Sequence, residues 1–381
     1  MKKVYWRPRT VSRTGLILIA LIALAGLFVV EQFKGPVRQP HFELKHAAAQ
    51  KAREAFEAIK AKRVEVGPPI DAEVDPFETG VIGLLNSPVT SVTGYLSAKQ
   101  ASVNPNFAAV VVDMLKQAGV EQGDVVALGV SGSFPALNAC AFAAVETLGA
   151  EPVSIASVSA SDWGASVPEL LWIDMEQVLV DAKVTEHRSF AASMGGHDDR
   201  GQGLDEEGKK LVLAGIERNK LELIQIEDFE ANVAHRVDLY RKQVGGRPIK
   251  AYINVGGGAV SVGRELGKEL FMPGLNLHPP KRVEYVPGVM STFSLQGVPC
   301  LHLIHVRDLA ERYGLPIEPL QAPAVGEAAV FEAIDYSRPL VLSVLGLIMA
   351  SLYGFIRTDI GFRLLRGSGR SGGDSFPEPM V

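Results

Sequence analysis

The chain has 381 residues, of which 47% are hydrophobic and 21% charged, so it can build a sizeable core and is not a disordered chain. Two cysteines, 23 prolines and 38 glycines without a triplet repeat exclude a disulfide-dense module, a cysteine-rich zinc domain and collagen. The net charge is −5, and the ends of the chain are its basic parts. We therefore expect no nucleic-acid partner, because a large cationic surface is needed to neutralise phosphates.

Two apolar runs near the chain ends predict membrane spans. Residues 14–30 are uncharged and follow five cations, and no small-x-small cleavage pattern comes after them. This favours an uncleaved anchor over a cleaved signal peptide. Residues 339–356 form a second apolar run, followed by four arginines, and a buried core helix is the alternative there.

Cytoplasmic flanks of membrane spans collect Lys and Arg, so we expect a cell-membrane protein with both termini in the cytoplasm and the main domain outside. Cys140 and Cys300 would then lie in an oxidising compartment that permits a disulfide, although each sits in its own apolar stretch and the pairing stays open. The predicted regions are a basic tail with its anchor (1–37), an amphipathic stalk helix with a linker (38–76), an extracytoplasmic α/β domain (77–332), and a second span with a basic cytoplasmic tail (333–381).

Residues 41–63 carry apolar side chains at helical spacing, which predicts the amphipathic stalk helix. The Gly-Pro-Pro run at residues 67–69 ends this helix, and we place the start of the globular domain near Phe77.

Beyond Phe77, apolar strands alternate with helices, which predicts an α/β fold with a mostly parallel, doubly wound sheet. The expected strands are residues 81–85, 124–130, 152–158, 221–226, 250–255 and 300–304. The expected helices are residues 104–118, 135–148, 168–182, 205–219, 228–244 and 306–313.

Ligands bind beyond the carboxyl ends of the strands in such a sheet, and three junctions there carry suitable residues. The first is Ser131, Gly132 and Ser133, where a strand runs into a helix that starts with Pro135. Its N–H groups and hydroxyls suit a carboxylate or phosphate. The run nearly matches a nucleophile elbow, but Ser133 replaces the required glycine. An anion site, a serine nucleophile and a structural turn all stay open.

The second junction holds Ser159, Ser161 and Asp162 after the next strand. Asp162 could orient a base, bind a cation or cap a turn.

The third junction is Asn254 followed by Gly256, Gly257 and Gly258, where a ligand could approach bare backbone. The glycine spacing departs from both the dinucleotide fingerprint and the P-loop, so we do not expect a nucleotide.

A polar loop places His197, Asp198 and Asp199 next to one another, which suits a cation site, acid–base work or an exposed loop. His302 and His305 are three residues apart without a third placed ligand, so we assign no metal, and the cofactor stays open.

Together with the two spans, four runs carry a family resemblance: GVSGSFPALNACAF, SVSASDWGAS, ASMGGHDDRGQG and YINVGGGAVSVG. The chain resembles the poly-gamma-glutamate system protein family. The resemblance implies an accessory membrane protein that works with the ligase and the other membrane components that make and export poly-γ-glutamate, a bacterial capsule or released polymer. It supplies no catalytic residues. The domain would bind the anionic polymer or partner proteins, through local donors or a cation at Asp162, Asp198 or Asp199.

Two other functions stay open. One is a membrane-anchored extracytoplasmic serine hydrolase, with Ser131 or Ser133 as the nucleophile and His197 or another histidine as the base. The other is a non-catalytic membrane scaffold, whose spans recruit partner helices through small residues such as Gly346 and Ser351.

Overall fold

The computed structural model describes residues 13–318 and 321–358. The chain divides into two compact units, one made of Met1–Val37 with Ala333–Val381 and the other of Arg38–Glu332. Most of the basic residues predicted to flank the spans belong to residues 1–12 and 359–381, which lie outside the described residues.

The first unit contains two apolar helices, α1 (Arg13–Gln32) and α13 (Arg338–Thr358). Their most apolar windows have mean hydropathies of 2.3 and 1.6, so both are long and apolar enough to cross a membrane. They coincide with the two predicted spans. Strands β1 (Gly35–Arg38) and β11 (Glu332–Asp335), which adjoin them, pair in a two-stranded sheet.

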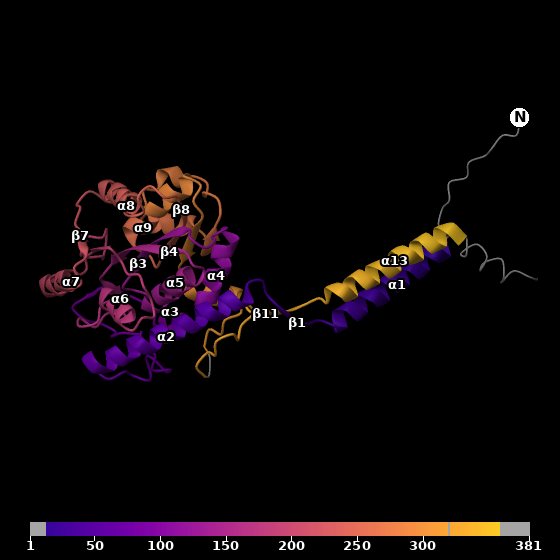
Figure 1. The fold of residues 1–381 in the computed structure, drawn as a ribbon, viewed down its shortest axis with the longest axis horizontal. Helices are drawn as coiled ribbons and strands as arrows, with labels where there is room; N and C mark the ends of the chain where they lie inside the picture. Colours follow the sequence, from indigo (N-terminus) through magenta and orange to yellow (C-terminus); the bar gives the residue numbers. More distant parts are fainter. Residues whose placement is uncertain (1–12, 319–320, 359–381) are drawn as a thin grey trace, which may run out of the picture. The chain divides into compact units, whose positions relative to one another are not determined.

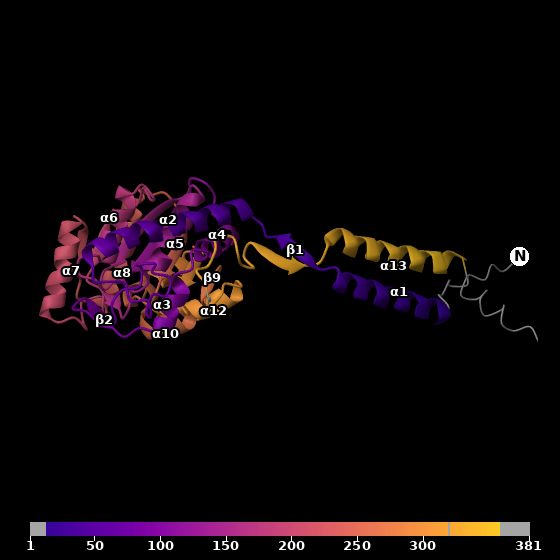
Figure 2. The ribbon, with the colours of Figure 1, turned by 90° about the horizontal axis from the view of Figure 1, so that it is seen from below.

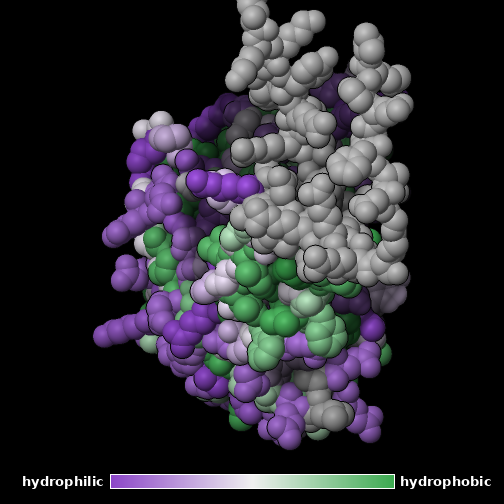
Figure 3. All heavy atoms as spheres, turned by 90° about the vertical axis from the view of Figure 1, so that its right-hand side faces the viewer, coloured by the Kyte–Doolittle hydropathy of each residue, from purple (hydrophilic) through white to green (hydrophobic). Residues whose placement is uncertain are grey.

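Helices α1 and α13 lie side by side (Figures 1 and 2). A Cβ placed on Gly26 would lie only 2.4 Å from Val344 Cγ1, so the small residue permits the close approach. Tyr336, just before α13, donates a hydrogen bond to Glu31 at the end of α1 at 2.5 Å. Gly26 meets Val344 further along α13, so the helices are antiparallel. Figure 3 shows a patch of apolar side chains, coloured green, on the surface that faces the viewer. The exposed ones on these helices include Leu16, Ile17, Leu24, Phe28, Leu342 and Leu347.

In the described part of the second unit, seven strands form one sheet in the order β7-β6-β4-β3-β8-β10-β9. All neighbours are parallel except β10 and β9, which confirms the mostly parallel α/β sheet. The strands are β3 (Val125–Ser131), β4 (Glu151–Ser157), β6 (Ala191–Ser193), β7 (Glu222–Ile224), β8 (Ile249–Val255), β9 (Gly274–Asn276) and β10 (Cys300–Leu303).

Helices cover both faces of the sheet, because the central strands bury both of their faces. Along β3, Val126 and Leu128 enter one hydrophobic cluster and Val125 and Ala127 the other. The first cluster includes α2 (Phe42–Val66), α4 (Phe107–Gln117), α5 (Pro135–Thr147), α6 (Trp172–Asp181), α7 (Glu206–Arg218) and α12 (Val306–Arg312). The second includes α8 (Phe229–Gln243), α9 (Ala259–Val262), the 3₁₀ helix η1 (Val283–Tyr285) and α11 (Val289–Leu295).

Most predicted elements form close to their expected bounds. Asp205 and Asp228 accept hydrogen bonds from the backbone of Gly208 and Ala231 at 2.7 and 2.8 Å. They cap α7 and α8, which therefore begin one residue after each aspartate.

One predicted strand, residues 81–85, is not a strand in the structure. A short pair forms instead between β2 (Thr90–Val92) and β5 (Ala160–Ser161), outside the main sheet. The short helices α3 (Leu96–Ser102) and α10 (Arg264–Leu270) were not predicted.

The predicted stalk helix is present as α2, but it belongs to the compact α/β unit, which begins at Arg38 and not near Phe77. Its stripe of Ala48, Ala52 and Ile59 is fully buried and packs against α4 and α5. The physical reason is that an apolar stripe needs a partner, and small alanines allow close contact between helices.

Cys140 and Cys300 are separate buried thiols. Cys140 belongs to the first hydrophobic cluster and Cys300 to the second, so they lie on opposite faces of the sheet. Burial raises the pKa of both thiols, which keeps them protonated.

Glu146 of α5 joins three segments of the second unit. Its carboxylate accepts hydrogen bonds from Lys51 of α2 at 2.5 Å, from Thr185 and from the ring of His187 at 2.8 Å. Burial raises the pKa of Glu146, but these three hydrogen bonds outweigh it and lower the pKa to about 2. The ionised carboxylate therefore stabilises the fold above pH 4.5, and this contribution is lost as the pH falls towards 2.

We expect Glu146→Gln to lower the free energy of unfolding at pH 7 by about 3 kcal/mol, because lowering a pKa from 4.5 to about 2 corresponds to roughly that energy. The difference from the unsubstituted chain should shrink at pH 3. Urea unfolding followed by circular dichroism measures both values. Glu57→Gln, at an exposed position of α2, is the control. An equal loss at both pH values would contradict the assignment.

Candidate functional site

A cavity of about 690 Å³ lies at the carboxyl ends of β3, β4, β6, β8 and β10. The chain continues from β3 to β4 on one side and later adds β8 on the other, so the strand order reverses between β3 and β8. Ligands of open parallel sheets bind at such reversals, where the connecting loops diverge. We call this cavity the switch-point pocket.

The structure brings many of the predicted site residues together at this pocket. Those that line it are Ser131, Ser133, Ser159, Ser161, His197, Asp199, Gly257 and Gly258. The predicted residues outside its lining are Gly132, Asp162, Asp198, Asn254 and Gly256.

The residues outside the lining shape the loops around it. Asp162 accepts a hydrogen bond from the backbone of Gly94 at 3.0 Å. A Cβ on Gly132 would lie 2.4 Å from the Val158 carbonyl oxygen, so that position needs a glycine. The Asn254 amide donates to the Gly256 carbonyl oxygen at 2.6 Å, which holds the turn after β8.

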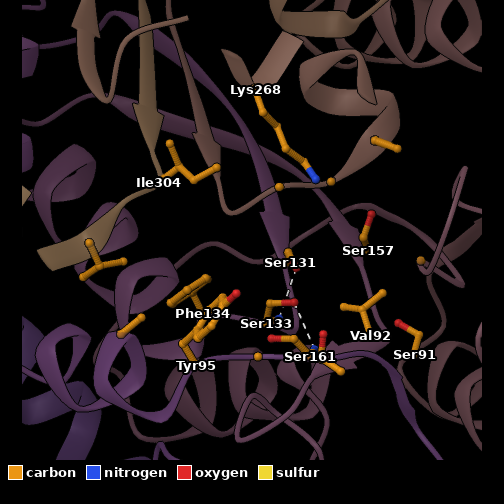
Figure 4. A pocket seen from close by; sticks show the side chains of 18 of the residues that line it. Ser91, Val92, Tyr95, Ser131, Ser133, Phe134, Ser157, Ser161, Lys268 and Ile304 are labelled. Atoms are coloured by element: carbon orange, nitrogen blue, oxygen red, sulfur yellow. Dashed lines mark hydrogen bonds between the residues drawn. The ribbon is translucent and has the colours of Figure 1, made fainter. Parts of the chain in front are cut away.

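One side of the pocket is built from serines at the ends of β3, β4 and β5. The Ser133 backbone N–H donates to Ser131 Oγ, and the Ser161 N–H donates to Ser133 Oγ, both at 3.1 Å (Figure 4). Ser159 Oγ contacts Ser91 Oγ at 2.9 Å. We call Ser131, Ser133, Ser159 and Ser161 the hydroxyl wall.

Lys99 also lines the pocket, and the sequence reasoning missed it. It is 2% exposed, and its amino group donates to the Ser133 carbonyl oxygen and, at 2.8 Å, to Ser161 Oγ. The Phe134 ring lies below it, 3.9 Å from Nζ to the centroid. Burial lowers the pKa of Lys99 to about 7, although the negative charge of Asp162 acts to raise it. A lysine in a short helix far from the main strands offers no sequence signal for this position.

Arg264 and Lys268 of α10 and Arg307 of α12 line the pocket as a cationic wall. Arg264 makes two hydrogen bonds of 2.8 Å to Asp198, and its guanidinium stacks on Phe229. In Figure 4, Lys268 points into the pocket from the upper part of the view, whereas Ser133 and Ser161 lie in the lower part. These cations were also missing from the predicted site.

Asp199 forms a buried ion pair with Arg236 of α8, and the two side chains are 4% and 5% exposed. The other Asp199 oxygen accepts from Ser193 Oγ at 2.6 Å and from Ser157 Oγ at 3.1 Å. Arg236 thus supplies the positive charge beside Asp199, where the sequence analysis had considered a bound metal cation.

Asp198 and His197 differ from Asp199 in their partners. The Arg264 guanidinium holds the pKa of Asp198 below its usual range, so this carboxylate is ionised and paired. The His197 side chain is 70% exposed, and its Nε2 lies 4.0 Å from the Asp198 carboxylate.

His302 and His305 lie in different surroundings. His302 is fully buried and contacts Asn254 at 3.0 Å, and burial lowers its pKa to about 4, whereas His305 lines the pocket. No cluster of three or more His, Cys, Asp or Glu suited to a metal ion occurs in the described part of the chain.

We compared the chain with models of protein families, with curated proteins and with solved structures, and none of them matched.

We expect Arg236→Met to lower the free energy of unfolding by about 3–5 kcal/mol, because it leaves the Asp199 carboxylate buried without its cation. The double variant Arg236→Met with Asp199→Asn should regain part of this loss. Urea unfolding of the full chain in detergent measures both. Arg241→Met, an exposed position of the same helix, is the control. A double variant no more stable than Arg236→Met would contradict the pairing.

Proposed function

We propose that this protein is an accessory membrane component of bacterial poly-γ-glutamate synthesis or export, and that it binds the polymer in the switch-point pocket. The observation that carries the proposal is the pairing of a hydroxyl wall with a cationic wall in one cavity. Poly-γ-glutamate presents a free carboxylate and an amide in every residue. Cations suit the carboxylates, and hydroxyl groups both donate to and accept from amides.

Local recognition also fits the charge of the protein. The acidic excess lies between the chain ends, so the polyanion would be repelled from much of the surface. Lys268 has a partner, Glu265, at 2.5 Å, but the Glu265 side chain is 82% exposed. A polymer carboxylate can therefore take the place of Glu265 at little cost, since exposed ion pairs contribute little.

The helix pair supports a membrane location for this function. Since α1 and α13 are antiparallel, two spans would leave the chain ends on one side of the membrane and residues 38–332 on the other. The cations of the chain ends favour the cytoplasm for the termini, which gives an extracytoplasmic domain that meets the emerging polymer.

A scaffold is the second candidate, and one observation favours it. A Cβ on Gly346 of α13 would meet nothing within 4 Å, so this small residue is free to contact a partner helix. In that role the spans recruit the ligase or other membrane components, and the pocket is dispensable.

Binding of γ-linked glutamate oligomers to the full chain in detergent, measured by titration calorimetry, tests the pocket. We expect Lys268→Ala to weaken binding about tenfold, because one charge-assisted hydrogen bond contributes about 1.5 kcal/mol. Lys209→Ala, at a half-buried position of α7 outside the pocket lining, should leave the affinity unchanged. Equal affinities of all three proteins, or no binding, would contradict a pocket that recognises the polymer.

A cellular experiment tests the role itself. Extracellular poly-γ-glutamate is measured in cells that express the synthesis genes with this gene intact, deleted, or carrying Lys268→Ala, with the levels of the other components checked. We expect deletion to change the yield or length of the polymer. A scaffold predicts that Lys268→Ala behaves like the intact gene, whereas polymer binding predicts that it resembles the deletion. An unchanged polymer after deletion would overturn both roles.

A further inference from the structure

The small strand pair β2–β5 places an amine beside a serine at the switch-point pocket. Val92 of β2 aligns with Ser161 of β5, and the Asp162 N–H donates to the Val92 carbonyl oxygen at 3.1 Å. Helix α3 follows β2 after three residues and carries Lys99. The pairing therefore holds Lys99 and Ser161 together, although they are far apart in the sequence.

The contact is within hydrogen-bond reach. Lys99 Nζ lies 2.8 Å from Ser161 Oγ, both residues line the pocket, and Ser161 is 6% exposed. The Ser133 carbonyl oxygen and the Phe134 ring hold the amine in place. A nucleophile with a base at this distance, and a base oriented by further groups, is the arrangement that covalent catalysis requires.

We propose that the switch-point pocket cleaves an amide or ester bond, with Ser161 as the nucleophile and Lys99 as the general base. The inference goes beyond polymer binding, and small acyl probes test it without any polymer. The cationic wall favours an acyl compound that carries a carboxylate near the bond to be cleaved.

The steps balance without a cofactor. Ser161 Oγ attacks the carbonyl carbon, and its proton passes to the neutral amine of Lys99. The bond from the carbonyl carbon to the nitrogen or oxygen of the leaving group breaks, and the leaving group takes the proton from Lys99. Water then attacks the ester on Ser161 and gives a proton to Lys99, which returns it to Ser161 as the carboxylic acid leaves.

Charges near Lys99 are compatible with a base that works near neutral pH. Burial lowers the pKa of Lys99 to about 7, so a large fraction of the amine is neutral at pH 7. Asp162 favours the charged form. Helix α12 packs against α3 and brings one residue of each sign, Arg307 and Asp308, to the pocket lining.

The other serines fit this role less well. Ser131 Oγ and Ser133 Oγ each accept a backbone N–H, which gives them a structural part in the turns. His197 is exposed and lies 4.0 Å from Asp198, and within the described part of the chain it makes no hydrogen bond to either serine. Ser161 replaces these serines as the nucleophile, and Lys99 replaces the histidine as the base.

Labelling with a fluorophosphonate tests the proposal in the full chain in detergent. The serine oxygen bonds to phosphorus, fluoride leaves, and mass spectrometry locates the label. We expect the label on Ser161, with a labelling rate that rises with pH through about 7. Ser161→Ala should abolish labelling. Lys99→Arg keeps the charge but cannot act as a base, and should slow labelling about 100-fold or more.

Two control variants match these substitutions. Ser291→Ala changes a buried serine outside the pocket lining, and Lys209→Met changes a half-buried lysine that is also outside it. Both should label at the unsubstituted rate, and thermal unfolding checks that every variant is folded. Hydrolysis of p-nitrophenyl acetate should follow the same order.

Labelling of the unsubstituted chain can by itself overturn the proposal, because this measurement does not depend on the folding of any variant. A label on another serine, or neither labelling nor hydrolysis at pH 8, excludes Ser161 as a nucleophile. Labelling at Ser161 with the same pH profile in folded Lys99→Arg excludes Lys99 as the base. None of these outcomes depends on whether γ-linked oligomers bind, so the two proposals fail separately.

Discussion

The parallel pairing of β3 with both β4 and β8 is the constraint on which the rest of the structure depends. Its register places Ser131 beside Ser157 and Gly129 beside Asn254, so the carboxyl ends of three strands meet at one edge. Every residue of β3 is buried, which requires helices on both faces and sends the connecting loops to the ends of the sheet. The loop after β3 leads towards one side of the sheet and the loop after β8 towards the other. The space between these loops is the switch-point pocket.

Burial of charge has two different outcomes near this edge. Asp199 is buried beside Arg236, so attraction between the two charges offsets the loss of water in a structural ion pair. Lys99 is equally buried, but its hydrogen bonds go to a carbonyl and a hydroxyl. Burial then outweighs the negative charge of Asp162 and lowers the pKa of Lys99. The cost of burying a charge is thus offset by an ion pair at Asp199, whereas at Lys99 it favours the neutral amine.

The elements that the sequence predicts are those with strong local signals. Strands β3, β4, β8 and β10 are apolar runs, and Pro135, Asp205 and Asp228 mark helix starts. Contacts between segments that are far apart in the sequence cannot be predicted from such local signals. The helical spacing of apolar residues in α2 predicts an amphipathic helix but not the partner of its apolar face. Strand β6 has only three small residues, which give no clear strand pattern. Six of the ten predicted junction residues line the pocket, because they follow the carboxyl ends of strands, whereas the position of Lys99 depends on the pairing of β2 with β5.

In our two proposals, binding and bond cleavage depend on different parts of the switch-point pocket. The cations come from α10 and α12, after β8 and β10, whereas Lys99 and Ser161 come from the segments around β2 and β5. A ligand carboxylate held by Lys268 is bound equally in the ground state and the transition state, so its loss raises KM. Lys99 acts only when the Ser161 proton moves, so its loss lowers kcat. Because a carboxylate and a carbonyl recur in every residue of a γ-linked glutamate chain, one wall can hold the chain while the other acts on it.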